Sequence, residues 1–228
     1  MTTDSSQTQS VDLHLVDAVT GETHDVVAGR LVVAGFTGRD KSGVEGHLEE
    51  LQALGVPVPD STPAFYELDP SLLTTADVIK VDGAMTSGEV EPVMVNANGQ
   101  WLLCVGSDHM DREIERSSIE MSKAACPKII SSSCVRVGAL MDWDGTRIHS
   151  WLDQETTPYQ AGSLAELLSL STLLDGASET VGTLGNGAVM FLGTVPIVDG
   201  RLRASAHFAG ELNIPDVGEP LSVSYRIL

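Results

Sequence analysis

Three carboxylates are the residues of this chain whose types and spacing could most readily do chemistry. Glu89 and Glu91 lie in one apolar run, Asp108 ends the next, and Asn98-Gly99 separates the two runs. An Asn-Gly pair between apolar runs is typical of a β-hairpin with a two-residue turn. That turn pairs Glu89 with Asp108 and Glu91 with Gly106. Because glycine has no side chain, we expect open space opposite Glu91. Because paired residues and i, i+2 neighbours share a face, the sequence predicts three carboxylates on one face.

A divalent cation is the simplest way to offset three like charges on one face of an apolar hairpin. Oxygen donors without a nearby Cys or His favour Mg²⁺, Mn²⁺ or Ca²⁺ over zinc. The alternative is a solvated strand face that binds nothing. The other residues expected on this face are apolar, which favours a buried face and hence the metal interpretation; they are Val93, Val95, Leu102 and Cys104.

Two further pairs could carry chemistry. His47 and Glu50 are three residues apart on a helix expected over residues 44–54, so they share a face. A carboxylate beside an imidazole suits general-base catalysis, although most such pairs are surface contacts. Arg112 follows Asp108 by one helical turn and could bind a substrate carboxylate through its fork. The alternative there is an ordinary helix salt bridge.

Three other polar residues are weaker candidates. Lys123 and Lys128 could bind an anion, or could be solvated lysines. Thr194, in the segment 193–196 after an apolar strand, offers a hydroxyl at a strand end, or belongs to a plain turn. The sequence contains no nucleophilic Ser or Cys signature, no phosphate-binding or dinucleotide glycine pattern, and no zinc spacing.

Composition restricts the possible partners. The chain has 228 residues, 42 % of them hydrophobic, a net charge of −19 and a pI of about 4.4. Nucleic acid and anionic membrane surfaces are therefore excluded as expected partners, and an anionic substrate is repelled at long range. Three cysteines without a Cys-x-x-Cys motif suit a reducing compartment. No apolar run reaches transmembrane length and no signal pattern is visible, so we expect a cytoplasmic protein.

The expected elements are mostly strands. A helix should open at Asp108, capped by Ser107 or Asp108 itself, and Ser163 to Glu166 forms a capping box that should start a helix reaching Leu174. We expect a polar tail over residues 1–10, N-terminal strands and a lid helix over 11–75, and a metal-binding core over 76–228, all in one compact unit. Strands are expected within 11–35 and at 78–81, 189–192, 201–208 and 221–228.

These pieces, in this order, resemble the fumarylacetoacetate hydrolase superfamily from about residue 35 to the end. Glu89-Val90-Glu91 resembles its Glu-x-Glu strand, and the segment 107–115 resembles its Asp-containing helix start. The segment 187–194 resembles its Gly-Asp-Val-Ile-x-x-Gly-Thr-Pro element. Residues 38–50, followed by 63–66, resemble its mobile N-terminal lid.

The resemblance implies an α+β, mostly β fold, with a distorted β-roll core and a few peripheral helices. It implies a homodimer and a Mg²⁺ or Mn²⁺ ion on Glu89, Glu91 and Asp108. His47, oriented by Glu50, would activate water as the catalytic dyad. The residues that it assigns to substrate binding are Arg39, Arg112, Lys123 and Thr194.

The implied activity is hydrolysis of a C–C bond in a small 2-oxo acid of the acylpyruvate kind, through a metal-stabilised enolate. The alternative within the superfamily is a decarboxylase, hydratase or isomerase of a 2-oxo dicarboxylic acid, which needs less of His47. Outside enzymes, the alternatives are a non-catalytic metal-binding or ligand-binding module and a structural protein with a solvated acidic hairpin.

Overall fold

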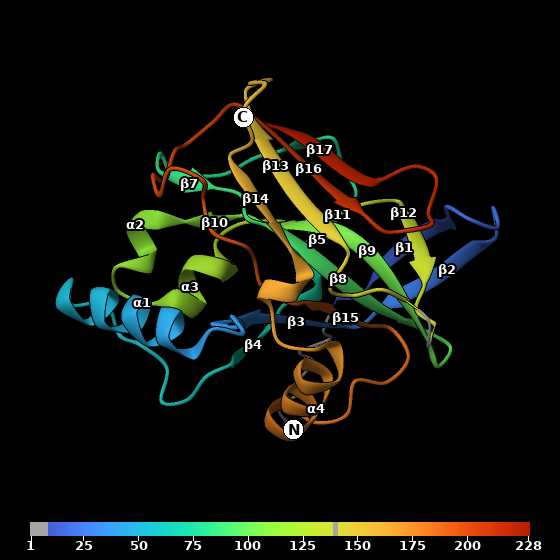
Figure 1. Ribbon diagram of the computed structural model, residues 1–228, viewed down its shortest axis with the longest axis horizontal. Coiled ribbons are helices and arrows are strands. Elements are labelled where there is room, and N and C mark those ends of the chain that lie inside the picture. Colours follow the sequence, from blue (N-terminus) through green and yellow to red (C-terminus); the bar gives the residue numbers. More distant parts are fainter. Residues whose placement is uncertain (1–8, 139–140) are drawn as a thin grey trace, which may run out of the picture.

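The molecule is built on two curved β-sheets, with helices at their margins (Figure 1). A computed structural model describes residues 9–138 and 141–228. The tail expected over residues 1–10 therefore lies largely outside the described residues. The predicted fold class, α+β and mostly β, is confirmed.

The larger sheet has ten strands and carries the hairpin. Its path is β2 (Thr23–Ala28), β1 (Val11–Asp17), β12 (Ser133–Arg136), β9 (Gln100–Asp108), β8 (Val90–Ala97), β15 (Ala188–Phe191), β3 (Arg30–Gly35) and β4 (Ala64–Leu68). Two short strands lie off this path, β11 (Lys128–Ile130) and β5 (Leu73–Thr74). The expected segments 11–75 and 76–228 therefore share one sheet.

Smaller elements complete the fold. The second sheet runs β14 (Gln160–Ser163), β13 (Arg147–Leu152), β16 (His207–Asn213), β17 (Leu221–Ile227) and β6 (Val78–Ile79), and β10 (Met110–Asp111) pairs with β7 (Thr86–Ser87). The α-helices of the described residues are α1 (Lys41–Ala53), α2 (Arg112–Glu115), α3 (Ile119–Ala124) and α4 (Leu170–Val181). Short 3₁₀ helices cover Pro70–Leu72 and Leu164–Glu166.

The hairpin of β8 and β9 has the predicted register. Asn98 and Gly99 adopt positive φ angles of 54° and 85°, as a two-residue hairpin turn requires. Glu91 pairs with Gly106, and Glu89 exchanges backbone hydrogen bonds with Asp108. The prediction of open space at Gly106 is wrong, because a Cβ there would lie 2.6 Å from the carbonyl oxygen of Ile129. Glycine is needed at this position because the packing is close.

The large sheet is buried on both faces. Met94 and Leu103 belong to the core between the sheets, whereas Val93, Val95 and Cys104 face a second core. Glu91 lies two residues before Val93 and so shares the second face. The predicted burial of the carboxylate face is thus confirmed.

Two predicted helix boundaries are wrong. Strand β9 continues through Asp108, and Asp111 caps α2 by accepting from the backbone N–H groups of Glu113 and Ile114. The predicted capping box exists, but it closes a 3₁₀ turn, because Leu167 is extended with ψ of 158°. Helix α4 begins afresh after Ser169, which caps it.

One predicted strand is displaced. The strand expected over 201–208 is β16, which begins at His207. Asp153 accepts hydrogen bonds from the backbone of Ala206 and His207 and so holds the chain just where the strand begins. Among the described residues, no helix combines the length and apolarity that crossing a bilayer requires.

Candidate metal centre and active site

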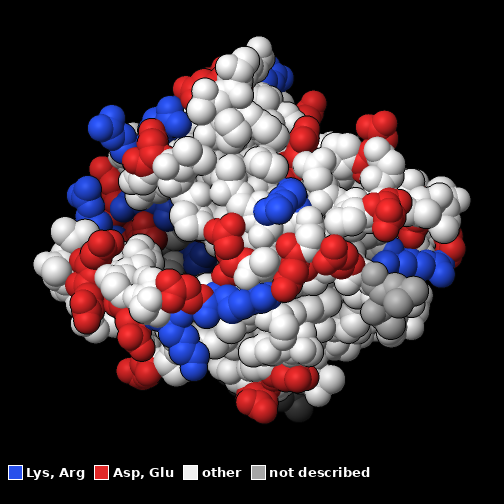
Figure 2. Space-filling model, in the orientation of Figure 1, with Lys and Arg blue, Asp and Glu red and all other residues white. Residues whose placement is uncertain are grey.

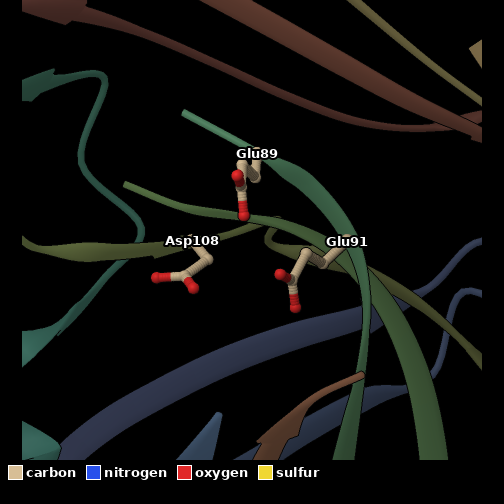
Figure 3. Close-up of side chains that lie close together, drawn as sticks. All are labelled: Glu89, Glu91 and Asp108. Carbon is tan, nitrogen blue, oxygen red and sulfur yellow. The ribbon is translucent and has the colours of Figure 1, made fainter. Parts of the chain in front are cut away.

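The three carboxylates of the hairpin gather around one space (Figure 3). Glu89 precedes β8, Glu91 lies within it, and Asp108 ends β9. Each contributes an oxygen that lies within 4.8 Å of the others'. Glu91 and Asp108 are fully buried, and Glu89 is partly exposed. The structure therefore brings together the three residues that the sequence predicts as metal ligands.

Asp108 is neutralised by two buried lysines. Lys128 is the direct cross-strand partner of Asp108, and its Nζ lies 3.0 Å from Oδ1 of the carboxylate. Lys123 of α3 donates a hydrogen bond to Oδ2. Burial alone would raise the pKa of Asp108, but the two lysines lower it to about 2. Asp108 is therefore a fixed anion at neutral pH.

Arg112 neutralises Glu89 in the same way. Its guanidinium donates to Glu89 at 2.6 Å, to Ser87 at 2.7 Å and to both oxygens of Glu115 at 3.1 and 3.2 Å. Burial alone would lower the pKa of Arg112, but Glu89 and Glu115 raise it above its ordinary value. The arginine is thus placed at the site, with its fork already occupied by two carboxylates.

Glu91 is the carboxylate that lacks a cation. Among the described residues, no Lys or Arg forms an ion pair with it, and its Oε2 accepts one hydrogen bond, from the backbone N–H of Gly193 at 2.8 Å. Burial, followed by the charge of Asp108, raises the pKa of Glu91 well above its ordinary value. A buried carboxylate in this position is stabilised by a proton or by a cation. The donor set fits a divalent cation that prefers oxygen ligands.

Thr194 lies beside the carboxylate strand, and its hydroxyl is engaged. It donates to the backbone oxygen of Val90 at 2.7 Å and accepts from Nε2 of Gln160 at 2.7 Å. Gln160 also accepts from the backbone N–H of Val90 at 3.0 Å. Gln160 was not predicted as a site residue, because no local sequence pattern signals contacts with such distant parts of the chain.

The predicted dyad lies on an exposed helix. His47 and Glu50 are 3.9 Å apart on α1, with side chains 59 % and 80 % exposed. No residue of α1 is buried. The His47 ring packs 5.9 Å from that of Phe36, and the next residue, Thr37, lies close to Gly193. The dyad thus does not contact the carboxylates, although the chain leading into α1 passes the site.

The Arg39 side chain binds residues outside the carboxylate site. Its guanidinium donates to Asp144 at 2.7 and 3.0 Å and to the backbone oxygen of Leu167 at 2.9 Å. The structure therefore brings Arg112 and Lys123 to the carboxylates, and does not bring Arg39 there.

A buried hydrogen-bond network joins the hairpin to Tyr225 of β17. The hydroxyl of Tyr225 lies 2.8 Å from Oγ of Ser107 and 2.9 Å from Nδ1 of His109. Burial, followed by the charges of Lys128 and Arg112, lowers the pKa of His109 to about 4, so its imidazole is neutral at neutral pH. No local sequence pattern predicts these hydrogen bonds, since Tyr225 comes from the last strand.

One face of the molecule has a hollow that combines both charges. Figure 2 shows a hollow left of centre, where Lys or Arg atoms lie deep, with acidic side chains around its rim. It lies between α3 and β14 as they are placed in Figure 1. A hollow with cations at its floor and acids at its rim is thus present on this face.

Solved structures share this fold. A "putative fumarylacetoacetate isomerase/hydrolase" from Oleispira antarctica superposes with a TM-score of 0.65 at 17 % identity, over 94 % of this chain and 99 % of that one. The 5-carboxymethyl-2-hydroxymuconate delta-isomerase from Mycobacterium smegmatis superposes with a TM-score of 0.61 at 13 % identity, over 92 % of this chain and 83 % of that one. The predicted resemblance is confirmed at the level of the fold.

Comparison of sequences places the chain more narrowly. A family model described as "Protein of unknown function (DUF2848)" matches residues 34–225. A search of curated proteins found no match.

Proposed function

This chain belongs to the DUF2848 family, and we propose that it is a divalent-metal-dependent enzyme that cleaves a C–C bond in a small 2-oxo acid by hydrolysis. One observation carries the proposal: three carboxylates converge in a largely buried site, and one of them, Glu91, has no cationic partner among the described residues. The burial of such a carboxylate is costly without a cation, and neither a purely structural nor a solvated acidic hairpin accounts for that cost.

The candidate ligands are Glu89, Glu91 and Asp108, and Mg²⁺ or Mn²⁺ suits their oxygens. When bound, the cation would supply Lewis-acid stabilisation of negative charge on an enolate oxygen. Gly193 and the two lysines hold Glu91 and Asp108 in place before any ligand arrives. Such preorganisation lowers the cost of assembling the site.

The dyad on α1 has the chemistry of a general base. The Glu50 carboxylate lies 3.9 Å from Nδ1 of His47, and it would orient the ring if closure brought the two within hydrogen-bond distance. For hydrolysis, α1 would have to close over the site so that His47 can take a proton from water. Since α1 buries no residue, this closure disrupts little packing.

A second candidate function is decarboxylation, hydration or isomerisation of a 2-oxo dicarboxylic acid. The exposure of His47 favours it, because decarboxylation and isomerisation pass through an enolate without an activated water, and only hydration would still need one. Product analysis on an acylpyruvate and on oxaloacetate separates the two candidates: hydrolysis yields two acids from the first, and decarboxylation yields CO₂ from the second.

Two substitutions test the proposal. Glu89→Ala should abolish Mn²⁺ binding, measured by calorimetry, and should abolish turnover with it. The control is Glu113→Ala, which removes an exposed carboxylate of α2 and should change neither. His47→Ala should leave Mn²⁺ binding intact and remove hydrolysis, and the exposed Glu49→Ala is its control. An active Glu89→Ala enzyme would refute the metal-dependent function. Normal Mn²⁺ binding without turnover of any oxo acid would favour a non-catalytic binding module.

A further inference from the structure

Two of the three cysteines lie opposite one another in the larger sheet. Strands β12 and β9 pair antiparallel, with Val135 opposite Leu103. One residue further along, the same register places Cys134 opposite Cys104. Directly paired residues share a face of the sheet, and both cysteines belong to the second core. The two side chains are therefore neighbours.

The type of pairing suits a covalent bond between them. The backbone N–H of Val137 donates to the carbonyl oxygen of Trp101 at 2.9 Å, so those two residues form a hydrogen-bonded pair. Hydrogen-bonded and non-hydrogen-bonded pairs alternate along an antiparallel ladder, which makes Cys104 and Cys134 a non-hydrogen-bonded pair. The Cα atoms of such a pair lie about 4.5 Å apart, within the range that a disulfide spans.

The ladder between β9 and β12 ends at the cysteine pair. The next residue of β9, Val105, bonds instead to Ser131, which donates its N–H at 2.8 Å and accepts at its hydroxyl oxygen at 3.2 Å. The hydroxyl of Ser131 also donates to the backbone oxygen of Ser133 at 2.7 Å. Because no further ladder pair follows here, the two backbones can adjust to a bond between the sulfurs.

The two thiols act on one another directly. Both side chains are fully buried. Burial, followed by the hydrogen bond with Cys134, raises the pKa of Cys104 well above its ordinary value, and the hydrogen bond with Cys104 lowers the pKa of Cys134. The sulfurs are therefore in contact, and Cys134 is the one with more thiolate character.

The segment between the two cysteines carries much of the candidate metal site. It contains β10, α2, α3 and β11. Four residues of the site lie on it, namely Asp108, Arg112, Lys123 and Lys128. A bond between Cys104 and Cys134 would close this segment into a covalent loop at its base.

We propose that Cys104 and Cys134 are a redox pair that hydrogen peroxide converts into a cross-strand disulfide, which clamps the loop 104–134. The Cys134 sulfur attacks a peroxide oxygen, the O–O bond breaks, and the sulfenic acid of Cys134 forms with release of water. The Cys104 sulfur then attacks the Cys134 sulfur, the S–O bond breaks, and a second water leaves. The thiols lose two electrons and two protons, and the peroxide is reduced to two waters.

The first experiment locates the bond in the wild-type protein. After treatment with millimolar hydrogen peroxide and removal of the peroxide by catalase, the protein is unfolded with iodoacetamide and digested with trypsin. Trypsin leaves each cysteine on its own peptide, 81–112, 124–128 or 129–136. Peptides 81–112 and 129–136 should be linked, and dithiothreitol should separate them. Unlinked peptides, or a link to 124–128 instead, would overturn the proposal.

Two variants control for oxidation elsewhere. Cys126→Ala should retain the link, because Cys126 is not part of the pair. Cys134→Ala should abolish it and keep both remaining thiols available for alkylation after dithiothreitol. A link between Cys104 and Cys126 in Cys134→Ala that forms as fast as the wild-type link would show that contact across the strands does not select the partner, and would contradict the proposal.

The third experiment measures the clamp. In EDTA, the oxidised wild-type protein should melt about 5 to 10 °C above the reduced protein, since closing the loop lowers the conformational entropy of the unfolded chain. Cys126→Ala should show the same rise, and Cys134→Ala should show none. A melting temperature that stays or falls on oxidation would overturn the clamp. Because EDTA removes any bound cation, these results do not depend on the proposed function.

Discussion

Asp108 shows how single residues prepare the site. Its carboxylate is fully buried between Lys123 and Lys128, and Lys128 is placed opposite it by the pairing of β11 with β9. Buried ion pairs contribute little net stability, but the loss of one partner leaves a charge without compensation. The two lysines therefore keep Asp108 ionised and fixed, while Glu91 is left to take up a proton or a cation.

Lys123→Met should lower the free energy of unfolding by about 3 to 5 kcal/mol in EDTA, because it removes one partner of a buried pair. Mn²⁺ should restore part of this loss, since a bound cation again compensates Asp108. Urea unfolding with and without Mn²⁺ measures both effects.

The exposed Lys80→Met is the matched control and should change stability by less than about 0.5 kcal/mol. A Lys123→Met protein as stable as wild type in EDTA would show that Lys128 alone suffices for Asp108. A large loss that Mn²⁺ leaves unchanged would speak against a cation near Asp108.

At the level of elements, the turn after β15 links the sheet to the site. Gly193 follows this strand with φ of 93°, and its N–H donates to Glu91. A Cβ at Gly193 would lie 2.0 Å from Oγ1 of Thr37, so the turn and the chain that leads into α1 are packed together. A change at this glycine therefore acts on Glu91 and on the entry to α1 at once.

Gly193→Ala should destabilise the protein by more than the cost of about 1 to 2 kcal/mol for a side chain at positive φ, because the Cβ also collides with Thr37. It should weaken Mn²⁺ binding too, since the N–H that orients Glu91 is displaced. Unfolding in urea and calorimetry with Mn²⁺ measure the two effects.

Gly200→Ala is the matched control for that substitution. Gly200 also has a positive φ, of 67°, but a Cβ there would meet nothing within 4 Å. Gly200→Ala should therefore destabilise the protein only by the cost of a side chain at positive φ, and it should keep wild-type affinity for Mn²⁺. Equal effects of the two substitutions on Mn²⁺ affinity would show that the Gly193 N–H does not position Glu91.

At the scale of the whole molecule, charge opposes the substrate that the site is proposed to bind. The net charge is −19, and acidic side chains lie around the hollow on the face shown in Figure 2. An anionic oxo acid is therefore repelled until it reaches the buried cations. Screening by salt weakens this long-range repulsion more than it weakens contacts inside the site.

Raising the salt concentration from about 0.01 M to about 0.15 M should therefore lower KM for an anionic oxo acid, since the Debye length falls from about 30 Å to about 8 Å over this range. Steady-state kinetics at constant pH measures the effect, and sucrose at equal osmolality is the control. A KM that rises with salt would show that local cations, and not the net charge, govern the approach of the substrate.

The sequence by itself determined the hairpin and its three carboxylates. Asn98-Gly99 selects a two-residue turn, and a two-residue turn leaves only one register for the flanking runs. Because that register depends on adjacent residues, it could be predicted without knowledge of the rest of the fold. The end of the helix expected over 44–54 was likewise predicted to within one residue, but the helix, α1, begins at Lys41, three residues before the predicted start, because Asp40 caps it.

Only the tertiary structure decided which groups surround those carboxylates. Lys128 and Gly193 reach the site through a sheet pairing and a turn that join distant parts of the chain. The sequence placed a helix start at Asp108, but its pairing with Glu89 extends β9 through that residue. The local preference of an aspartate to cap a helix is overridden here because the backbone pairing of two strands contributes more free energy than a cap.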